Sequence, residues 1–212
     1  MKRFRALLLI LAVIAAILPA AAQFRYAPVV GVTISDLKFK QDLFPVGKTV
    51  GAQVGVIGEM MFPGIGFGLD LGLLYNQMGA KTDLGSREIW QVDGFGDERL
   101  TLHTIQIPIH LRFKWTRMNG FEEYSAPFVY GGPDFGINVA HSKIKGNPGV
   151  SNPYKFAGGD LGVTAGGGFE LYKRWQVSLQ YTWGMTYLVK TRKLDNLSAR
   201  NRQWAVRVSY FF

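Results

Sequence analysis

Three histidines and one neighbouring serine are the side chains of this sequence best suited to hydrolysis or metal binding. The histidines occupy positions 103, 110 and 141, and Ser142 follows the last of them. Hydrolysis by a serine requires a base in contact with the nucleophile and a third group that orients the base. His141 and Ser142 are consecutive residues at the end of a predicted strand, so their side chains point to opposite faces. We therefore expect polar loop residues here.

The remaining signals for site chemistry are weak. The histidines have no spacing typical of metal ligands, and a chain without cysteine has no thiol nucleophile, disulfide or site for lipid attachment. The run Gly166-Gly167-Gly168 follows no β-α unit and precedes no helix, so it is not a phosphate loop. Close backbone approach or bending of a strand explains it better. The sequence predicts no catalytic residue, no metal ion and no cofactor.

Ionisable side chains stand on the polar faces of several alternating segments. The set comprises Glu59, Asp70, His110, Arg112, Glu170 and Arg207. Burying a charge is costly unless the charge is paired, so residues of this kind should neutralise one another where they meet. We interpret the set as a structural polar network inside a narrow lumen, with a proton or ion path as the alternative.

These side chains must be positioned by long segments in which polarity alternates with a period of two. The clearest is the hairpin Gly159–Leu188, whose second arm places Trp175, Val177 and Leu179 on one face and Gln176 and Ser178 on the other. Such alternation predicts β-strands. A strand of a soluble protein usually has about five or six residues, whereas a strand that spans a bilayer needs roughly nine to eleven. The pattern therefore predicts a transmembrane β-barrel.

The alternation predicts eight strands. They are Tyr26–Leu37, Thr49–Met61, Gly66–Gln77, a strand around Ile105–Trp115, Ala126–Ala140, the two arms of the hairpin, and a last strand after Asn201. Long connections are expected at 38–48, 78–99, 141–158 and 189–201, and shorter ones between them. Outer-membrane barrels combine an even number of antiparallel strands, short periplasmic turns and long external loops. The predicted fold is an all-β, eight-stranded antiparallel outer-membrane barrel with both termini in the periplasm.

The first 22 residues predict a signal peptide. Lys2, Arg3 and Arg5 precede an apolar run that ends near Leu18, and small residues follow. The apolar run is shorter than the roughly 20 residues that a membrane helix needs. We expect cleavage between Ala22 and Gln23, so that residues 23–212 form the barrel domain and the formal charge falls from +9 to +6.

A soluble exported barrel remains as an alternative. A lipocalin-like barrel has the same alternation with its apolar face turned inward, around a hydrophobic ligand. The glycine-rich polar face and the terminal aromatic residue favour the membrane barrel. So do aromatic residues towards the strand ends, where membrane girdles belong: Trp115, Trp175, Trp183, Tyr187 and Trp204.

Two of the predicted external loops are basic. Their cations are Lys143, Lys145 and Lys155 in one loop, and Lys190, Arg192, Lys193 and Arg200 in the next, where Asp195 is the one acidic residue. Such a rim would attract the phosphates of lipopolysaccharide or an acidic protein, and ordinary contact with lipid, as any outer-membrane barrel makes it, is the alternative. Another predicted loop is acidic, so the rim is divided in sign; its acids are Asp83, Glu88, Asp93, Asp97 and Glu98. No nucleic-acid motif is present. Tyr210 and Phe212 in the terminal strand are the expected insertion signal for the barrel-assembly machinery.

The sequence resembles the PorT-like family of small outer-membrane β-barrel proteins of Bacteroidetes. The similar stretches are Leu102–Trp115, Pro127–Asn138, Gly162–Phe169, Gln180–Thr186 and the segment from Asn201 to the end. Relatives often carry arginine where Gln180 stands, so a luminal ion pair is not expected there. The resemblance implies an outer-membrane barrel, and it ties only some members to secretion or gliding machinery.

These features together predict a non-enzymatic envelope protein whose external loops meet a partner or lipopolysaccharide. A porin is disfavoured, because side chains fill the interior of eight strands and open channels need about sixteen. An accessory role in a secretion or gliding complex is the alternative. An enzyme that modifies lipids, working through His103 or His141, is the weakest candidate.

Overall fold

The structure is a computed structural model that describes residues 23–41, 45–64, 66–86, 88–118, 120–142, 147, 154–191 and 198–212, with only the backbone at 23, 89 and 90. The predicted signal peptide, residues 1–22, lies outside the described residues. Among the described residues, no helix is both long enough and apolar enough to cross a membrane.

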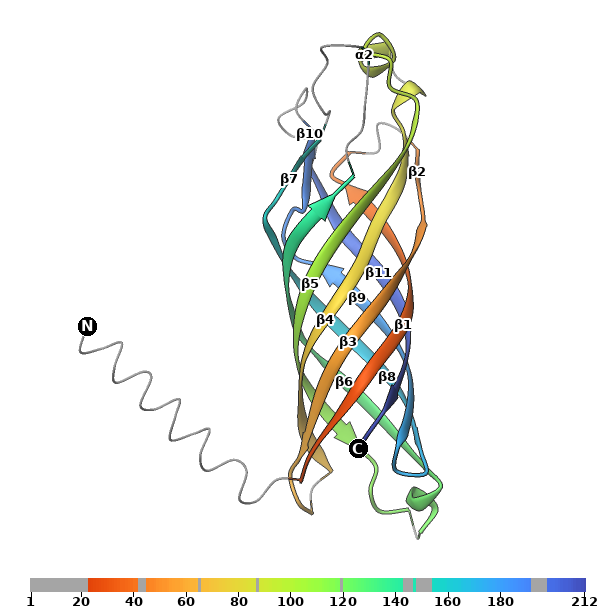
Figure 1. The fold of residues 1–212 in the computed structure, drawn as a ribbon, viewed down its shortest axis with the longest axis vertical. Coiled ribbons are helices and arrows are strands. Elements are labelled where there is room, and N and C mark those ends of the chain that lie inside the picture. The colour runs from red at the N-terminus through yellow and green to blue at the C-terminus, as the bar shows by residue number, and fades with distance from the viewer. Residues whose placement is uncertain are drawn as a thin grey trace, which may run out of the picture.

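Eight long strands form a closed wall, which confirms the predicted fold (Figure 1). They are β1 (Gln23–Phe39), β3 (Thr49–Met61), β4 (Phe67–Asp83), β5 (Asp97–Lys114), β6 (Ser125–His141), β8 (Gly159–Leu171), β9 (Trp175–Gly184) and β11 (Ser198–Tyr210). Each strand pairs antiparallel with the next, and β11 pairs with β1 to close the sheet. The short strands β2 (Val46–Gly47), β7 (Tyr154–Phe156) and β10 (Val189–Thr191) extend one edge of the wall.

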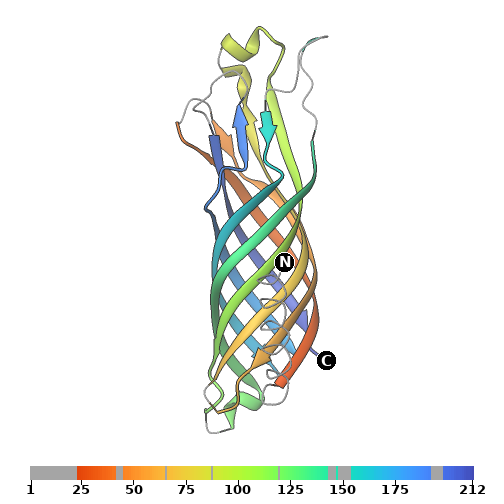
Figure 2. The same ribbon diagram turned by 90° about the vertical axis from the view of Figure 1, so that its left-hand side faces the viewer.

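The short and long connections lie at opposite ends of the barrel, as Figures 1 and 2 show. One end carries the connections from β3 to β4, from β5 to β6 and from β8 to β9, and both ends of the described chain. The other carries the helical turns η2 (Leu84–Ser86) and α2 (Glu88–Gln91), while η3 (Phe121–Glu123) belongs to the short-turn end. Because periplasmic turns are short and external loops long, we assign the first end to the periplasm.

Apolar side chains face outward along the strands, and polar side chains face inward. On β11, the outward-facing Trp204 and Val206 are 47% and 50% exposed, whereas the inward-facing Arg207 is only 6% exposed. The same outward apolar face continues on the other strands. The soluble alternative required the apolar face to point inward, so that alternative is wrong.

Aromatic side chains border this apolar face at two heights. The periplasmic girdle contains Tyr26, Phe113, Trp115, Trp175, Tyr210 and Phe212. In the external girdle, the Tyr181 ring lies 4.4 Å from Trp183 and 4.7 Å from Trp204. Arg202 stands ten residues before Phe212, which corresponds to about 25 Å at ~3.3 Å per residue and a tilt of ~40°. That height matches the apolar band of outer-membrane barrels, about 25 Å.

Beyond the band the wall continues as a collar, made of the outer ends of β1, β4, β5 and β11 together with β2, β7 and β10. The prediction of a loop at 78–99 is wrong over much of that range, since β4 continues to Asp83 and β5 starts at Asp97. The expected loops 38–48 and 189–201 are also too long, because β1 reaches Phe39 and β11 starts at Ser198.

The polarity pattern explains why the collar strands were missed. On β4 the inward residues change from polar to apolar, from Asn76 to Met78 and Ala80, while the outward face changes from Tyr75 to Lys81. The alternation therefore reverses its phase where the strand leaves the bilayer. A search for one continuous apolar face ends at that point, although the strand itself continues.

Candidate functional site

The periplasmic half of the lumen holds ionised side chains centred on Glu59, which is fully buried. Its Oε1 atom lies 2.5 Å from Arg25 Nη2 and 2.7 Å from Lys114 Nζ. Its Oε2 atom lies 3.1 Å from Arg112 Nη1. Three cations from β1 and β5 thus surround one carboxylate on β3, which offsets the cost of burying it.

Glu170 and Asp70 complete this periplasmic network. Glu170 Oε2 lies 2.5 Å from Arg25 Nη2 and 2.9 Å from Lys114 Nζ. Arg112 Nε donates to both oxygens of Asp70 at 2.8 Å, and Arg112 Nη2 lies 2.7 Å from Asp70 Oδ2. Three carboxylates then face three cations, so the charges of this network balance.

Contacts between distant strands close the barrel at this level. Gln176 on β9 donates through Nε2 to Glu59 on β3 and to Glu170 on β8, both at 2.8 Å. It also accepts from Arg112 Nη1 on β5 at 3.0 Å. The Phe128 ring covers the Arg112 guanidinium, with 4.2 Å between Cζ and the ring centroid. Strands β9 and β5 are three positions apart in the sheet, so this contact crosses the lumen.

A second polar layer contains the other two predicted residues. His110 Nε2 lies 2.9 Å from Asp134 Oδ1. Arg207 Nη2 donates to the Tyr130 hydroxyl at 2.8 Å and also bonds Gln180 Oε1. The partners of Arg207 here are neutral groups, in line with glutamine rather than a charged residue at position 180.

A small cavity of about 10 Å³ separates the two layers. Its lining includes Asp70, His110, Arg112, Tyr130 and Arg207. A cavity of this size has room for about one water molecule. The six predicted luminal residues therefore lie in two adjacent layers: four meet in the periplasmic network, and two lie above it.

Amide side chains of different strands meet in a further layer of the lumen, nearer to its external end. Asn76 on β4 and Gln203 on β11 exchange two hydrogen bonds of 2.9 Å through their amide groups. Gln53 Nε2 donates to Gln106 Oε1 at 3.0 Å. Because β4 and β11 are separated by two strands, the amide pair bridges the lumen.

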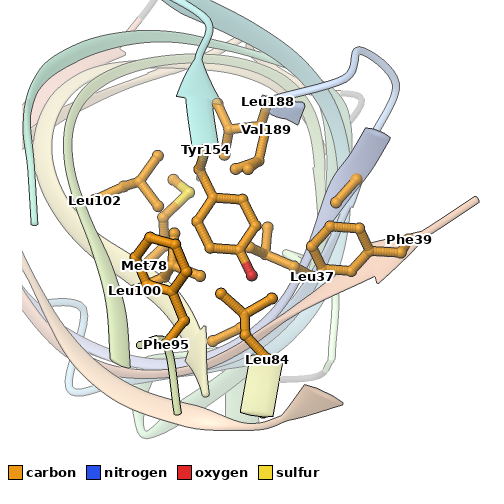
Figure 3. Packing of buried hydrophobic residues seen from close by; sticks show 12 residues of the cluster. Leu37, Phe39, Met78, Leu84, Phe95, Leu100, Leu102, Tyr154, Leu188 and Val189 are labelled. Carbon is orange, nitrogen blue, oxygen red and sulfur yellow. The ribbon is translucent and has the colours of Figure 1, made fainter. Parts of the chain in front are cut away.

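An apolar core fills the collar above these amides (Figure 3). Its members are Leu37, Phe39, Met78, Ala80, Leu84, Phe95, Leu100, Leu102, Tyr154, Leu188, Val189 and Ala199. Figure 3 shows the Tyr154 ring in the middle, with the other side chains around it. Burial raises the pKa of Tyr154, so its hydroxyl stays protonated and donates to Thr82 Oγ1 at 3.1 Å. The lumen is thus filled by apolar groups at its external end.

Three charged members of the luminal layers were absent from the predicted set. Arg25 was placed before the first predicted strand, but β1 starts at Gln23 and turns Arg25 inward. Lys114 and Asp134 alternate in phase with the polar faces of β5 and β6, so the period-two pattern could have identified both. No polarity pattern in the segments predicted as loops indicated the apolar core of the collar.

The glycine run on β8 gives room to this interior. A Cβ atom at Gly166 would lie 2.8 Å from the Tyr130 ring and 2.8 Å from Gln180 Cβ. Both distances are shorter than real side chains tolerate. Close approach is therefore the reason for glycine at Gly166, which confirms the interpretation drawn from the sequence.

The histidines outside the lumen do not assemble with a nucleophile and an acid. The Tyr75 hydroxyl lies 2.5 Å from His103 Nδ1 at the external edge of the apolar band. The His141 ring packs against Phe156, with 4.3 Å between centroids, while Ser142 Oγ accepts from the Thr101 amide at 3.0 Å. Among the described residues, no group of three or more His, Asp or Glu side chains could hold a metal ion.

Only part of the predicted basic rim can be located. Lys155 on β7 and Lys190 on β10 are exposed and stand directly opposite each other in the strand register. Lys143, Lys145, Arg192 and Lys193 lie outside the described residues. The two located lysines therefore form a cation pair on the collar.

The terminal aromatic residues belong to the periplasmic girdle. The Tyr210 ring lies 4.9 Å from Trp175 and 5.1 Å from Phe212. The Phe212 amide donates to the Tyr26 carbonyl at 3.1 Å, which fixes the chain end against β1. This places both predicted insertion-signal residues on the lipid-facing side.

Comparison with solved structures finds other small outer-membrane barrels. OprG from Pseudomonas aeruginosa superposes with a TM-score of 0.51 at 12% identity, covering 91% of this chain and 96% of OprG. Ail from Yersinia pestis, in complex with a heparin analogue, gives 0.45 at 15% identity and covers 90% and 99% of the two chains. Neisserial surface protein A gives 0.42 at 14% identity, with coverages of 88% and 97%.

At 12% identity, the likeness to OprG concerns the fold alone. No curated protein sequence matches the chain. The family described as outer membrane protein beta-barrel domain matches residues 19–190, which is most of the chain. Together with the closed wall, the outward apolar band and the two aromatic girdles, this match shows that the chain belongs to the outer membrane protein beta-barrel family.

Proposed function

We propose that this outer-membrane protein is a closed, non-enzymatic barrel that presents its collar to an anionic partner at the cell surface. The observation that carries the proposal is the filled lumen. Side chains from distant strands meet in the charged network, in the amide layer and in the collar core. A barrel filled in this way has its outer surfaces, rather than a channel, available for function.

The lack of an enzymatic role is part of the proposal. An outer-membrane hydrolase needs a nucleophile in contact with a base, and an acid that orients the base. His141 packs on an aromatic ring and Ser142 bonds the backbone of β5, so the two do not act together. His103 contacts the Tyr75 hydroxyl, and among the described residues no second base contacts that hydroxyl to activate it as a nucleophile.

The Lys155–Lys190 pair supports an anionic partner. Like charges directly opposite each other on neighbouring strands destabilise the pairing of those strands. Phosphates of lipopolysaccharide or carboxylates of an acidic protein would relieve that repulsion. The predicted cations Lys143, Lys145, Arg192 and Lys193 would add to the same rim.

Binding of a phosphorylated core oligosaccharide, freed of its acyl chains, tests this role. The double variant Lys155→Gln/Lys190→Gln should bind the oligosaccharide several-fold more weakly than the wild type, and the difference should shrink as salt is added. Lys173→Gln/Arg174→Gln removes the same charge from the opposite end of the barrel and serves as control. Equal weakening in both variants would contradict a specific basic rim.

Two further roles are also part of the proposal. Residues 1–22 act as a signal peptide, which N-terminal sequencing of the mature protein would test by finding Gln23 first. Tyr210 and Phe212 serve the barrel-assembly machinery, supported by their position in the lipid-facing girdle. Removal of both aromatic rings should reduce the amount of protein inserted in the membrane.

A role beside a secretion or gliding complex is the second candidate. Its support is the resemblance of Leu102–Trp115 and Pro127–Asn138 to the PorT-like family of Bacteroidetes. The collar, which stands clear of the membrane band, is the surface that would meet such a complex. Loss of a secreted cargo from the medium after gene deletion would favour this role over lipopolysaccharide contact.

A further inference from the structure

A buried guanidinium borders the small cavity between the two luminal layers. Arg207 on β11 is only 6% exposed and lines this cavity of about 10 Å³. Its hydrogen-bond acceptors among the described residues are the Tyr130 hydroxyl, at 2.8 Å, and Gln180 Oε1, and both of these groups are neutral. A buried charge is costly unless an opposite charge compensates it. Arg207 therefore brings into the lumen a positive charge that no ion pair with a described residue neutralises.

The carboxylates around this cavity are already engaged by other groups. Asp70, the one carboxylate among the described residues that line the cavity, accepts from Arg112 Nε through both oxygens at 2.8 Å. Asp134 bonds a histidine and a threonine through its two oxygens and is not part of the lining. The charges of the periplasmic network already balance among its own members. Arg207 is therefore a surplus cation beside the cavity.

Asp160, a further luminal carboxylate, is too distant to compensate Arg207. The register pairs Arg207 with Ser178 on β9, and Ser178 with Gly168 on β8. Asp160 stands eight residues from Gly168 along β8, which corresponds to roughly 26 Å at a rise of ~3.3 Å per residue. Across that distance the carboxylate does little to offset the cost of burying the guanidinium.

Hydrogen-bond donors without a described protein acceptor border the same cavity. A guanidinium donates through Nε, Nη1 and Nη2, and only Nη2 of Arg207 has acceptors among the described residues. Ser178, directly opposite Arg207 in the register, and Ser209, the next inward residue on β11, also line the cavity. Neither serine hydroxyl bonds another described residue. The groups available to a ligand here are thus mainly donors.

The Arg207 side chain is held in place by its surroundings. Its Cζ atom lies 5.5 Å from the centroid of the Tyr130 ring, and Arg112 Cζ lies at the same distance from that ring. Gly31 stands opposite Arg207 on β1, where an added Cβ atom would lie 3.0 Å from Arg207 Cγ. A guanidinium confined in this way loses little conformational freedom when it binds an anion.

We propose that this cavity binds one small monovalent anion, namely chloride, which compensates Arg207 inside the closed barrel. The guanidinium and the hydroxyls of Ser178 and Ser209 donate to the ion. A cavity with room for about one water molecule excludes larger, polyatomic anions such as methanesulfonate. A water molecule would fill the same space and leave the charge uncompensated. The site lies in the interior of the barrel, so it does not require a partner at the collar.

The test measures how the stability of the full barrel in detergent micelles depends on chloride. Urea unfolding at constant ionic strength, with sodium methanesulfonate exchanged stepwise for sodium chloride, separates specific binding from general screening. Because the unfolded chain lacks the site, one bound ion multiplies the folding equilibrium constant by one plus the ratio of the chloride concentration to Kd. We expect the urea midpoint of the wild type to rise with chloride. Above Kd, each tenfold step in chloride should raise the folding constant about tenfold.

Two variants with the same change of charge separate the cavity from the surface. Arg207→Met removes the buried charge and should abolish the dependence on chloride. Arg202→Met removes an exposed arginine from the outward face of the same strand and should keep the wild-type dependence. Heat-shifted mobility on gels checks that each variant folds. Ser178→Ala/Ser209→Ala retains every charge, and loss of its two donors should weaken chloride binding several-fold; this variant carries the test if Arg207→Met does not fold.

Bromide locates the ion directly, because it substitutes for chloride and scatters X-rays anomalously. Crystals of the wild type grown in sodium bromide should show an anomalous peak in the cavity, within hydrogen-bond reach of Arg207 and the two serines. Crystals of Arg207→Met should lack that peak. A cavity in the wild type that contains ordered water and no bromide would overturn the proposal.

Three results of the unfolding experiment would also overturn the chloride site. They are a wild type whose midpoint does not respond to chloride, an equal response in Arg207→Met, and a response lost equally in Arg202→Met. None of them bears on the proposed rim function, because binding of the acyl-free oligosaccharide is measured on Lys155→Gln/Lys190→Gln, which keeps the cavity intact.

Discussion

Glu59 holds more of the periplasmic network together than any other described carboxylate, since it contacts Arg25, Arg112, Lys114 and Gln176. Loss of its charge leaves three cations facing two carboxylates, Glu170 and Asp70, so one positive charge of the network is no longer compensated. The cost of breaking a buried ion pair by removing one partner is larger than the net worth of the pair itself. The network is therefore more sensitive to single substitutions than its balanced charge suggests.

Substitution Glu59→Gln should lower the free energy of unfolding by about 3–5 kcal/mol. Urea unfolding of the protein in phospholipid vesicles measures this change. The control is Glu123→Gln, because Glu123 and Lys173 form an exposed ion pair of 3.1 Å whose loss should cost below about 1 kcal/mol. Similar losses in the two variants would show that the lumen does not depend on this network.

A smaller residue-scale test concerns Gly166. Substitution Gly166→Ala should displace the Tyr130 ring, because the added Cβ would lie 2.8 Å from it. Overpacking of this kind typically costs about 1–3 kcal/mol. Substitution Gly96→Ala, at a glycine whose added Cβ would meet no neighbour within 4 Å, is the matched change. A Gly166→Ala variant as stable as Gly96→Ala would contradict close packing.

The sequence could predict which ionisable residues face the lumen, but not which of them meet. Period-two alternation placed Glu59, Asp70, His110, Arg112, Glu170 and Arg207 on the polar face. Which of them meet depends on strand stagger, which alternation does not contain. Arg25 was missed because its strand begins earlier than the apolar pattern does.

At the scale of elements, the strands serve two environments in one length. Strands β4 and β5 contain 17 and 18 residues, long enough to span the bilayer and form the collar. Inside the bilayer their apolar face points to lipid, and in the collar it points to the lumen. The apolar face changes sides because lipid surrounds the wall within the bilayer, whereas water surrounds the collar.

Leu100 tests the collar core. It is fully buried, so Leu100→Ala should lower the free energy of unfolding by about 2–5 kcal/mol. Leu73→Ala makes the same change on the lipid-facing side of β4, where Leu73 is 59% exposed, and should cost about 1 kcal/mol or less. Urea titration of both variants gives the comparison, and equal costs would mean that the collar core contributes no special stability.

The hairpin turn between β8 and β9 is strained. Tyr172 and Lys173 have φ angles of 51° and 59°, which non-glycine residues rarely adopt. Their replacement by Asn-Gly, the pair favoured where both central residues have positive φ, should raise stability by about 1 kcal/mol. A lower unfolding midpoint in urea would contradict this assignment of strain.

Fold class was accessible from the sequence because lipid imposes a simple rule on strands. One face must be apolar over the whole bilayer, and Thr49–Met61 obeys that rule so cleanly that its predicted bounds are the observed ones. Outside the bilayer no such rule applies. The outer ends of β4, β5 and β11 were therefore taken for loops.

At the scale of the whole molecule, three kinds of filling close one lumen. The charged network occupies the periplasmic half, amide pairs bridge the middle, and the apolar core fills the collar. An eight-stranded wall leaves an interior that side chains can fill. In the proposed function, the protein therefore acts through its outer surfaces.

Single-channel recording of the purified wild-type protein in planar lipid bilayers tests the closed lumen most directly. Heat-shifted mobility on gels would first establish that the barrel is folded and inserted. A closed lumen predicts a current that stays at the baseline of the protein-free bilayer at neutral pH and moderate voltage. Discrete, reproducible conductance steps from the folded wild type would contradict it, because ions would then pass through a lumen that the charged network, the amides and the collar core are inferred to close.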